Sequence, residues 1–474
     1  MKRSKRIGIL LCVLLAACAV TFALMGVEER KEQIKTSGEI IMEVTSDSVQ
    51  SLSWTYGENS FSFRRNNGSW LYEDDEDFPV DEEKIAALLD QFESFGVSFI
   101  IEDVEDLSVY GLDDPVCTIQ FETEDQSTTM ELGNFSEMDE ERYVSIGDGN
   151  VYLAKVDPLD QFDAVLSDLI DHDESLSYDT VSQISFQGTD GYAIQYEENS
   201  TASYCADDVY FTQQDGTSLP LDTDRVESYL ETLTTLSLTD YVTYHATEEE
   251  LASYGLDVPE LTITVDYTST DDNGTDVSDS FVLSFSRDPE ELAAAEEAEE
   301  KGETAEDITG YVRIGDSQIV YRVSAYTVES LMAYTYDDLR HREVLTADLA
   351  DIDQLDITLD GANYTLTADE SSEADARTWM YAGEQIDADE LESALTELRA
   401  SSTESFTVDG TAGKEEICLT VYLNNEDHPQ VTIELYRYDG SQCLAKVDGE
   451  TFALVPRADV VDLIEAVNAI ILQH

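Results

Sequence analysis

The sequence predicts an α+β protein made of three tandem related units, each an antiparallel β-sheet with one or two helices packed on one face. A strand-like segment recurs at residues 47–54, 179–186 and 351–357, and in each copy apolar and polar residues alternate as in a half-buried strand. Each copy then enters a segment with apolar residues three and four apart, which indicates one apolar helical face. The turn signal Asp148-Gly149-Asn150 between two strand-like runs favours antiparallel pairing.

The first 30 residues are predicted to attach the chain to a membrane. Lys2, Arg3, Lys5 and Arg6 precede an apolar run over residues 7–27 that holds no charged residue. At about 1.5 Å per residue this run makes roughly 31 Å of helix, enough to cross a hydrocarbon core of about 30 Å. The leading cations hold their end in the cytoplasm. We therefore expect a single-pass cell-membrane protein whose bulk is extracytoplasmic.

Two other interpretations of residues 1–30 stay open. Leu15-Ala16-Ala17-Cys18 resembles the lipobox of bacterial lipoproteins, in which cleavage before Cys18 is followed by acylation of that cysteine. Residues 19–26 continue as apolar filler, whereas a lipoprotein normally turns polar after its cysteine, so the uncleaved helix is favoured. The third interpretation is a cleaved secretory peptide. All three place the rest of the chain outside the cytoplasm.

The chain is intensely acidic, with 104 acidic against 25 basic residues and a net charge of −79. Like charges at this density repel one another and also repel phosphates, so we expect no nucleic-acid partner. The acidic residues are scattered, which favours a solvated surface over a cation-collecting one. Hydrophobic residues make up 42% of the chain, and this content excludes a disordered protein.

Repeat 1 is assigned to residues 40–172. Its helix begins after Asp81, a suitable N-cap. Residues 107–115, which read LSVYGLDDP, form a short helical turn that ends at Gly111. Further strands and a closing helix are expected at 61–63, 119–121, 130–132, 143–146, 151–155 and 159–169.

Repeat 2 is assigned to residues 178–338 and follows the same order. Its helix begins after Asp222, and residues 251–259 read LASYGLDVP, so that the turn recurs. An acidic insertion at 287–307, rich in Glu and Ala, is expected to be an exposed helix or a disordered loop. We interpret the shared turn as a packing corner rather than a ligand contact. Its residues are Tyr110, Gly111, Leu112, Tyr254, Gly255 and Leu256.

Repeat 3 is assigned to residues 345–474 and is diverged. Its helix begins after Asp387, but the Tyr-Gly-Leu turn is missing. Four strands and a closing helix are expected at 417–423, 431–436, 443–447, 452–455 and 458–472. Cys117 and Cys418 lie in apolar strand-like runs, so buried thiols are favoured over bridges. Cys418 and Cys443, on strands predicted to be neighbours, are the one plausible disulfide pair.

The sequence predicts no enzyme activity, no cofactor and no catalytic or metal-binding residue. It contains no H-E-x-x-H pair, no G-x-S-x-G elbow and no G-x-x-x-x-G-K loop. The most ligand-like cluster, residues 171–174 (DHDE), is interpreted as a solvated linker. Arg340-His341-Arg342 is interpreted as local charge balance, with docking on an anionic partner as the alternative.

A family resemblance follows from these motifs. A Trp followed by an apolar-Pro-apolar-Asp helix start, then L-x-x-Y-G-L-D-x-P, then strands carrying Y-V-x-I-G-D, resembles the bacterial domain-of-unknown-function family DUF4340. The pattern covers residues 70–156 and, with the insertion, 210–323; residues 379–455 are a diverged third copy. The resemblance implies the fold and assigns no catalytic residue.

Members of that family look like anchored envelope proteins, some of them associated with ABC-type transport systems. The resemblance therefore implies a non-catalytic scaffold or accessory subunit of an envelope system, bound to the membrane through residues 7–27 and to an envelope or ABC transporter protein. The alternative is a module that binds a cation, a peptide or a cell-wall polymer.

Overall fold

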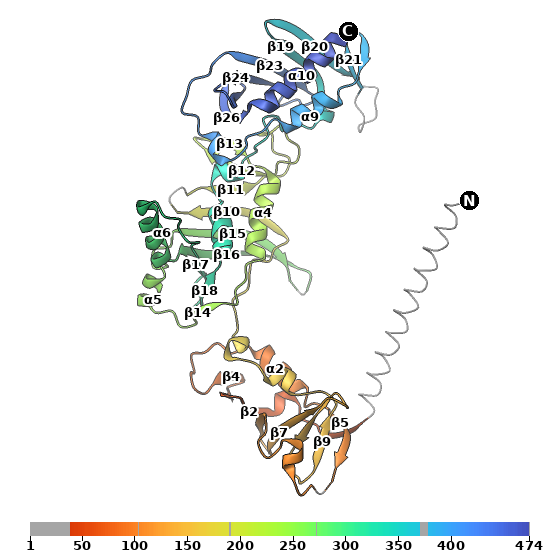
Figure 1. The fold of residues 1–474 in the computed structure, drawn as a ribbon, viewed down its shortest axis with the longest axis vertical. Coiled ribbons are helices and arrows are strands. Elements are labelled where there is room, and N and C mark those ends of the chain that lie inside the picture. Colours follow the sequence, from red (N-terminus) through yellow and green to blue (C-terminus); the bar gives the residue numbers. More distant parts are fainter. Residues whose placement is uncertain (1–37, 103, 189–190, 272, 370–377, 474) are drawn as a thin grey trace, which may run out of the picture. The chain divides into compact units, whose positions relative to one another are not determined.

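Figure 1 shows the computed structural model of the chain, which describes residues 38–473 apart from 103, 189–190, 272 and 370–377. The chain divides into two compact units, Met1–His172 and Asp173–His474. The first holds one antiparallel sheet and the second holds two. The three sheets and their helices confirm the predicted fold class of three related α+β units.

The sheet of repeat 1 has nine strands in the order β1-β5-β9-β8-β7-β6-β2-β3-β4. Its main helix, α2 (Glu82–Asp90), begins as predicted, because the Asp81 carboxylate accepts hydrogen bonds from the backbone N–H groups of Glu83 and Lys84. The predicted closing helix is shorter than expected and consists of α3 (Leu159–Phe162) and a 3-10 turn (Leu166–Leu169). The strands are β1 (Glu39–Met42), β2 (Val49–Tyr56), β3 (Asn59–Asn66), β4 (Ser69–Tyr72), β5 (Phe95–Ile101), β6 (Cys117–Thr123), β7 (Ser127–Ser136), β8 (Glu141–Ser145) and β9 (Val151–Ala154).

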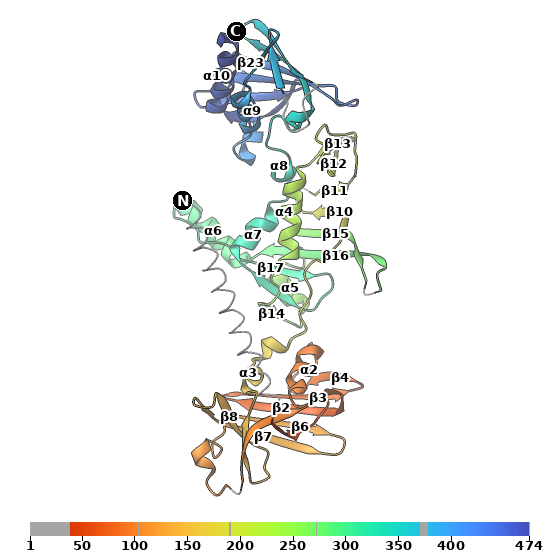
Figure 2. The same cartoon turned by 90° about the vertical axis from the view of Figure 1, so that its right-hand side faces the viewer.

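The sheet of repeat 2 also has nine strands, in the order β13-β12-β11-β10-β15-β16-β17-β18-β14. Figure 2 shows α4 (Thr223–Thr234) lying across this sheet. The acidic insertion forms an exposed helix, α6 (Pro289–Lys301), capped by Asp288 and ended by Gly302. The other helices are α5 (Glu248–Ser253), α7 (Ala325–Met332) and α8 (Tyr336–Leu339). The strands are β10 (Thr180–Gln187), β11 (Ala193–Tyr196), β12 (Tyr210–Gln214), β13 (Thr217–Pro220), β14 (Tyr241–Thr243), β15 (Leu261–Thr270), β16 (Asp276–Arg287), β17 (Gly310–Ile314) and β18 (Val320–Val323).

The sheet of repeat 3 has eight strands in the order β22-β21-β20-β19-β23-β24-β25-β26. It is covered by α9 (Asp389–Glu397) and by the closing helix α10 (Arg457–Gln473), whose apolar residues join one core with the strands. The strands are β19 (Ile352–Leu359), β20 (Ala362–Asp369), β21 (Thr378–Tyr381), β22 (Glu384–Ile386), β23 (Glu415–Leu423), β24 (Gln430–Arg437), β25 (Gln442–Val447) and β26 (Glu450–Pro456).

The three sheets share a strand arrangement and an irregularity. In each, the opening strand, defined as the strand of the recurring segment (β2, β10 or β19), lies between two partners. One is its hairpin partner and the other is a strand that follows the main helix, which gives the orders β3-β2-β6, β11-β10-β15 and β20-β19-β23. In each, the register with that later strand shifts near the start of the opening strand, between Val49 and Ser51, Val181 and Gln183, and Ile352 and Gln354. A bulge at the same place in three sheets supports descent from one repeated unit.

Each sheet buries one face against helices and leaves its central strands polar on the other face. In β2, Leu52 and Trp54 are buried while Ser51 and Ser53 are half-buried, as the two-residue period of a strand requires. The Trp54 ring meets the Phe162 ring of α3 at 5.3 Å. The same alternation in β10 and β19 means that helices cover the apolar face in all three repeats.

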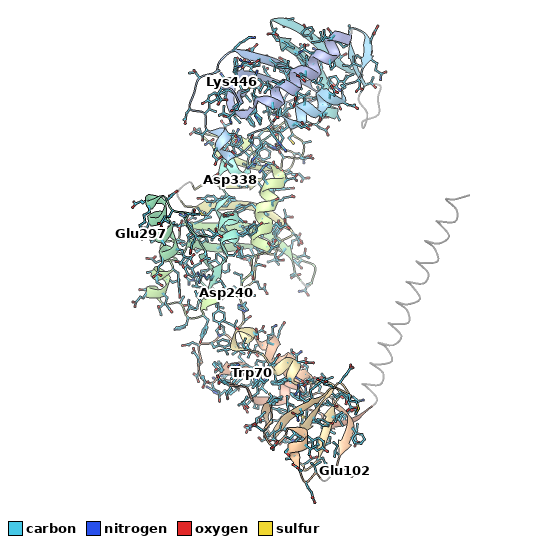
Figure 3. All side chains as sticks on the ribbon, viewed as in Figure 1. Trp70, Glu102, Asp240, Glu297, Asp338 and Lys446 are labelled. Atoms are coloured by element: carbon cyan, nitrogen blue, oxygen red, sulfur yellow. The ribbon has the colours of Figure 1, made fainter. Side chains whose placement is uncertain are left out.

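Cations also pack on aromatic rings near the sheet surfaces. Figure 3 labels Trp70 in repeat 1 and Lys446 in repeat 3. The Arg65 guanidinium lies 5.0 Å from the centre of the Trp70 ring, and Lys446 Nζ lies 5.8 Å from the centre of a tyrosine ring. In this strongly acidic protein, basic side chains are therefore held by cation–π contacts as well as by carboxylates.

The described cysteines are free thiols, as the sequence favours, and the Cys418–Cys443 disulfide that it left open as an alternative does not form. Cys418 lies in β23 and Cys443 in β25, and β24 separates these two strands. Cys443 is fully buried, whereas Cys418 is half-buried beside Glu434. All four described cysteines are free thiols.

The membrane prediction concerns residues 7–27 and Cys18, which lie outside the described residues. Within the part of the chain that the structure describes, no helix combines the length and the apolarity needed to span a bilayer.

Candidate functional site

The Tyr-Gly-Leu turn of repeat 1 lies at a tightly packed corner. Gly111 adopts a left-handed conformation with φ of 68°, and a Cβ placed there would lie 2.6 Å from Asn134 Cγ. The Tyr110 ring meets the Tyr143 ring at 5.0 Å, and Leu112 is buried. Glycine is therefore required both by the backbone conformation and by the space available.

Repeat 2 builds the same corner and extends it. Gly255 has φ of 71°, and the rings of Tyr254 and Tyr311 lie 4.6 Å apart. Tyr311 donates a 2.7 Å hydrogen bond to Asp288, the N-cap of α6. Leu256 is buried in a small cluster with Tyr311 and Val320. These contacts are those of a packing corner, which now also holds the insertion helix.

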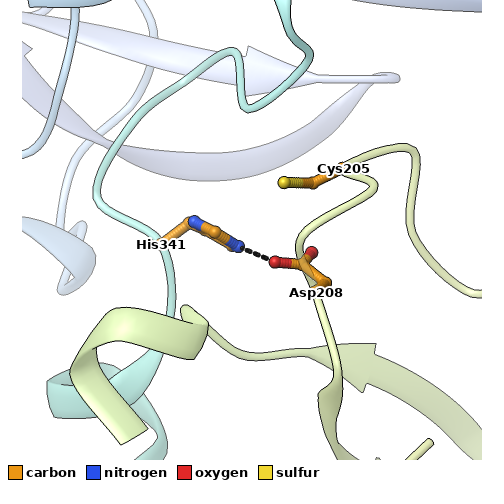
Figure 4. A group of neighbouring side chains, drawn as sticks. All are labelled: Cys205, Asp208 and His341. Atoms are coloured by element: carbon orange, nitrogen blue, oxygen red, sulfur yellow. Dashed lines mark hydrogen bonds and ion pairs between the residues drawn. The ribbon is translucent and has the colours of Figure 1, made fainter. Parts of the chain in front are cut away.

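The candidate site is a polar cluster that joins Cys205 and Asp208 of repeat 2 to His341, just after repeat 2, with Asp208 buried and the other two half-buried (Figure 4). Cys205 and Asp208 belong to the loop before β12, and His341 follows α8, 133 residues after Asp208. His341 Nε2 lies 2.8 Å from Asp208 Oδ1. The Asp208 side chain is 1% exposed and that of His341 is 17% exposed. Figure 4 shows the Cys205 thiol beside this pair.

Local hydrogen bonds hold the Asp208 loop in place. Ser203 Oγ donates a 2.6 Å bond to Asp208 Oδ2. Thr223 Oγ1 donates to the carbonyl of Asp207 at 2.8 Å and accepts from the backbone N–H of Val209 at 3.1 Å. These bonds hold the loop that carries Asp208 against the first turn of α4. Asp208 Oδ2 accepts the bond from Ser203, and Oδ1 faces His341.

Asp222 faces the other side of the histidine. It caps α4, and its Oδ2 accepts a 3.0 Å bond from Arg225 Nε and lies 3.9 Å from His341 Nδ1. The backbone N–H of Asp222 also donates to the carbonyl of Leu339 at 2.9 Å, just before the histidine segment. Both ring nitrogens of His341 therefore face carboxylates.

Burial and charge act in opposite directions on this histidine. Burial alone lowers the pKa of His341, but the hydrogen bond and charge of Asp208, together with the charges of Asp222 and Glu343, raise that pKa by more. Burial, and next the charge of Asp208, raises the pKa of the Cys205 thiol to about 11. The thiol is thus protonated at neutral pH.

This arrangement does not suit nucleophilic catalysis. A catalytic cysteine needs a lowered pKa and a base with a nitrogen free to receive its proton. Here the pKa is raised, and both nitrogens of His341 face carboxylates. The cluster instead gathers ligand atoms. Within the described residues, two groups of three such atoms lie within 4.8 Å of one another, namely Cys205, Asp208 and His341, and Asp222, His341 and Glu343.

The sequence interpretation missed this cluster, which has no motif spacing. Residues 171–174, the cluster it singled out, make structural hydrogen bonds: the backbone N–H of Asp171 donates to the carbonyl of Pro79, and Ser317 donates to Asp173. Arg340 does not project toward solvent but lies over the rings of Phe406 and Phe452, at 4.3 and 5.0 Å. The contacts of His341 with Asp208 and Cys205 become visible only in the structure, because the residues lie far apart in the sequence.

A groove also follows α4 and α7 in repeat 2. Two adjoining hollows of about 600 and 560 Å³ share the side chains of Ser228, Thr232, Tyr326 and Ser330. Tyr326 is 79% exposed. The groove is lined mostly by hydroxyl and carboxylate groups around one exposed aromatic ring.

One comparison with known proteins finds a match. A family model described as "Domain of unknown function (DUF4340)" matches residues 70–259 and residues 212–418. The matches begin in β4 and β12, which are equivalent strands. The first ends just before β15 and the second ends in β23, so each runs through one repeat into the middle of the next. Neither the curated proteins nor the solved structures contain a match.

Proposed function

The chain belongs to the DUF4340 family, and on that premise we propose that it is a membrane-tethered extracytoplasmic scaffold, a non-catalytic accessory subunit of an envelope system of the ABC transport type. In this proposal residues 7–27 form the tether, and the protein acts by binding a protein partner rather than by transforming a substrate.

The observation that supports this proposal is the repetition of one polar sheet face. Gln120, Thr264 and Thr420 occupy equivalent positions in the central strands β6, β15 and β23. Each pairs with a residue of the neighbouring strand: Ser53 in β2, Ser185 in β10 and Asp356 in β19. All six side chains are exposed or half-buried. A surface built three times in one chain suits repeated contact with an extended partner.

The charge of the chain indicates what such a partner presents. A net charge of −79 repels acidic proteins and anionic lipid headgroups. Complementary association then requires a partner with a basic extracytoplasmic surface, and its rate should fall as salt screens the attraction.

The test is capture of the full-length chain from living cells. We expect cross-linking followed by purification from solubilised membranes to recover a permease or another envelope protein in constant ratio. Gln120→Arg places a long cation on the polar face of repeat 1 and should reduce that recovery. Gln161→Arg makes the same change on the helical side of repeat 1, where Gln161 is exposed in α3, and should leave recovery unchanged.

Recovery of the chain alone would overturn the scaffold proposal, as would equal recovery with both variants. Mass measurement of the membrane-bound chain tests the tether separately. An intact N-terminus supports the helix at residues 7–27, and a chain that begins at an acylated Cys18 replaces it with a lipid anchor.

A wall-polymer binding module is the second candidate, and the α4–α7 groove favours it. The exposed Tyr326 ring beside Ser330 and Thr232 offers a flat apolar surface next to hydroxyl donors. Sedimentation of the full-length chain with purified cell-wall polymer, lost in Tyr326→Ala and retained in Tyr196→Ala, would favour this function over the scaffold.

A further inference from the structure

We propose that Cys205, Asp208 and His341 bind one divalent transition-metal ion of the zinc type, and that Asp222 positions His341 for it. This metal site does not depend on the proposed scaffold role. The sequence alone predicts no metal ligand.

The three side chains are a zinc ligand set. Thiolate, imidazole and carboxylate are the groups that bind zinc in proteins, at about 2.0–2.3 Å from the ion. Binding of the ion therefore releases the protons of the Cys205 thiol and of His341 Nε2 to solvent. Tetrahedral geometry at those bond lengths separates ligand atoms by about 3.3–3.8 Å. The three ligand atoms lie within 4.8 Å of one another, so small side-chain movements bring all of them to that spacing.

The closest pair shows what must move. His341 Nε2 and Asp208 Oδ1 are 2.8 Å apart, in direct hydrogen-bond contact. An ion that enters between them replaces this hydrogen bond and pushes the two atoms roughly 0.5–1 Å apart. Ser203 already holds Oδ2 of the same carboxylate, which leaves Oδ1 directed at the site.

The surroundings supply an outer layer of support. A metal-bound histidine usually donates its other ring N–H to a carboxylate, which sets the tautomer and the ring orientation. Asp222 Oδ2 stands 3.9 Å from His341 Nδ1, on the side away from Asp208. Arg225 Nε holds Asp222 at 3.0 Å, and Asp208 is buried, so the site is both oriented and shielded.

The position of the site gives the ion a structural consequence. His341 lies two residues before Glu343, which forms a β-bridge with Arg399 of repeat 3, and Val344 donates a 3.0 Å hydrogen bond to the carbonyl of Leu398. An ion at His341 therefore ties the α4 end of repeat 2 to the segment that leads into repeat 3. Metal binding should raise the melting temperature of the second compact unit.

The experiment uses the full-length chain, purified in detergent and stripped of metal with a chelator. Zn²⁺ is titrated with Mg²⁺ in excess, because Mg²⁺ occupies the many surface carboxylates without competing for a thiolate site. Co²⁺ serves as the optical probe, since a cobalt–thiolate bond gives a charge-transfer absorption. We expect one tightly bound ion per chain, the cobalt–thiolate band, and a higher melting temperature.

Variants assign the ion to these residues. Cys205→Ser should abolish the cobalt–thiolate band and weaken Zn²⁺ binding at least tenfold, and His341→Gln should weaken it similarly. Cys418→Ser is the matched control, because Cys418 is a half-buried thiol beside carboxylates in repeat 3 and should leave the band intact. Circular dichroism of the metal-free variants checks that each folds.

Two results would overturn the site: a band that persists in Cys205→Ser, or Zn²⁺ binding of unchanged affinity in both site variants. If His341→Gln fails to fold, Cys205→Ser decides alone, because it keeps the His341–Asp208 pair. Binding that Mg²⁺ fully displaces would assign the ion to surface carboxylates and would equally reject the proposal.

Discussion

His341 and Asp208 lie 133 residues apart in the chain and meet through a 2.8 Å contact between Nε2 and Oδ1. Because the Asp208 side chain is almost fully buried, this contact should contribute to the stability of the fold even without a bound metal ion. It also fixes the segment that leads from repeat 2 into repeat 3.

Removal of the histidine should destabilise the metal-free chain in a pH-dependent way. His341→Gln leaves Asp208 buried without its cation, and we expect a loss of about 2–4 kcal/mol in the free energy of unfolding. The folded-state pKa of His341 is raised, so the stabilisation is fully present below the unfolded value of about 6.5 and fades as pH rises through the folded value.

Urea unfolding at several pH values measures this effect. The gap between wild type and His341→Gln should be largest below about pH 6.5 and should narrow toward alkaline pH. His245→Gln, at an exposed histidine of repeat 2, is the control for the loss of a histidine and should cost much less stability than His341→Gln. A gap that widens with rising pH would contradict the assignment.

The Arg142–Asp157 pair should be one of the strong ion pairs of repeat 1. Arg142 Nε lies 2.7 Å from Asp157 Oδ1, both side chains are about 10% exposed, and Arg142 also donates to the carbonyl of Gly133. Arg142→Ala should cost about 3–5 kcal/mol, because it leaves a buried carboxylate unpaired. Lys414→Ala removes the exposed pair with Asp360 and should cost under about 1 kcal/mol in the same unfolding assay.

The Gly111 corner should be intolerant of any side chain. Gly111→Ala combines the left-handed backbone cost of about 1–2 kcal/mol with a collision with Asn134. Gly57→Ala has a similar φ of 60° and no atom within 4 Å of the new Cβ, so it carries the backbone cost alone. The melting temperature should fall further for Gly111→Ala, and equal falls would show that the corner has room.

The positioning role of Asp222 can be separated from its role as a helix cap. Asp222→Asn keeps an N-cap side chain but removes the charge that faces His341 Nδ1, so Zn²⁺ affinity should fall about 10–100-fold in a metal-free chain that still folds. Asp81→Asn makes the same change at the equivalent cap of repeat 1 and should leave Zn²⁺ affinity unchanged. Equal affinities for Asp222→Asn and wild type would remove Asp222 from the site.

The cysteines of repeat 3 should remain thiols in the oxidised protein. Alkylation in denaturant without reductant, followed by peptide mapping, should modify both Cys418 and Cys443. In the native chain Cys418 should react first, because it is half-buried while Cys443 is fully buried. Burial also raises the pKa of Cys443 to about 11 and so slows its reaction at neutral pH. A linked Cys418–Cys443 peptide would contradict the strand order.

Local physics explains which elements could be predicted. The N-cap carboxylates of Asp81 and Asp222 and the left-handed glycines at 111 and 255 act within a few residues of their own position, so sequence spacing reveals them. Edge strands such as β1 and β14 are hard to predict because they are short and carry little alternation. The sequence alone does not decide whether Cys418 and Cys443 are neighbours, because adjacency in a sheet depends on which strands pair, and β24 lies between β23 and β25.

The sequence by itself determined the three repeats, their α+β class and their family, because periodicity, capping and turn chemistry are short-range properties repeated along the chain. Only the tertiary structure decided that His341, interpreted from the sequence as part of a charge-balancing run, meets Asp208 and Cys205. The reason is physical: the loop before β12 and the segment before His341 both hydrogen-bond to the start of α4, through Thr223 and Asp222. No spacing rule encodes a contact that folding makes across 133 residues.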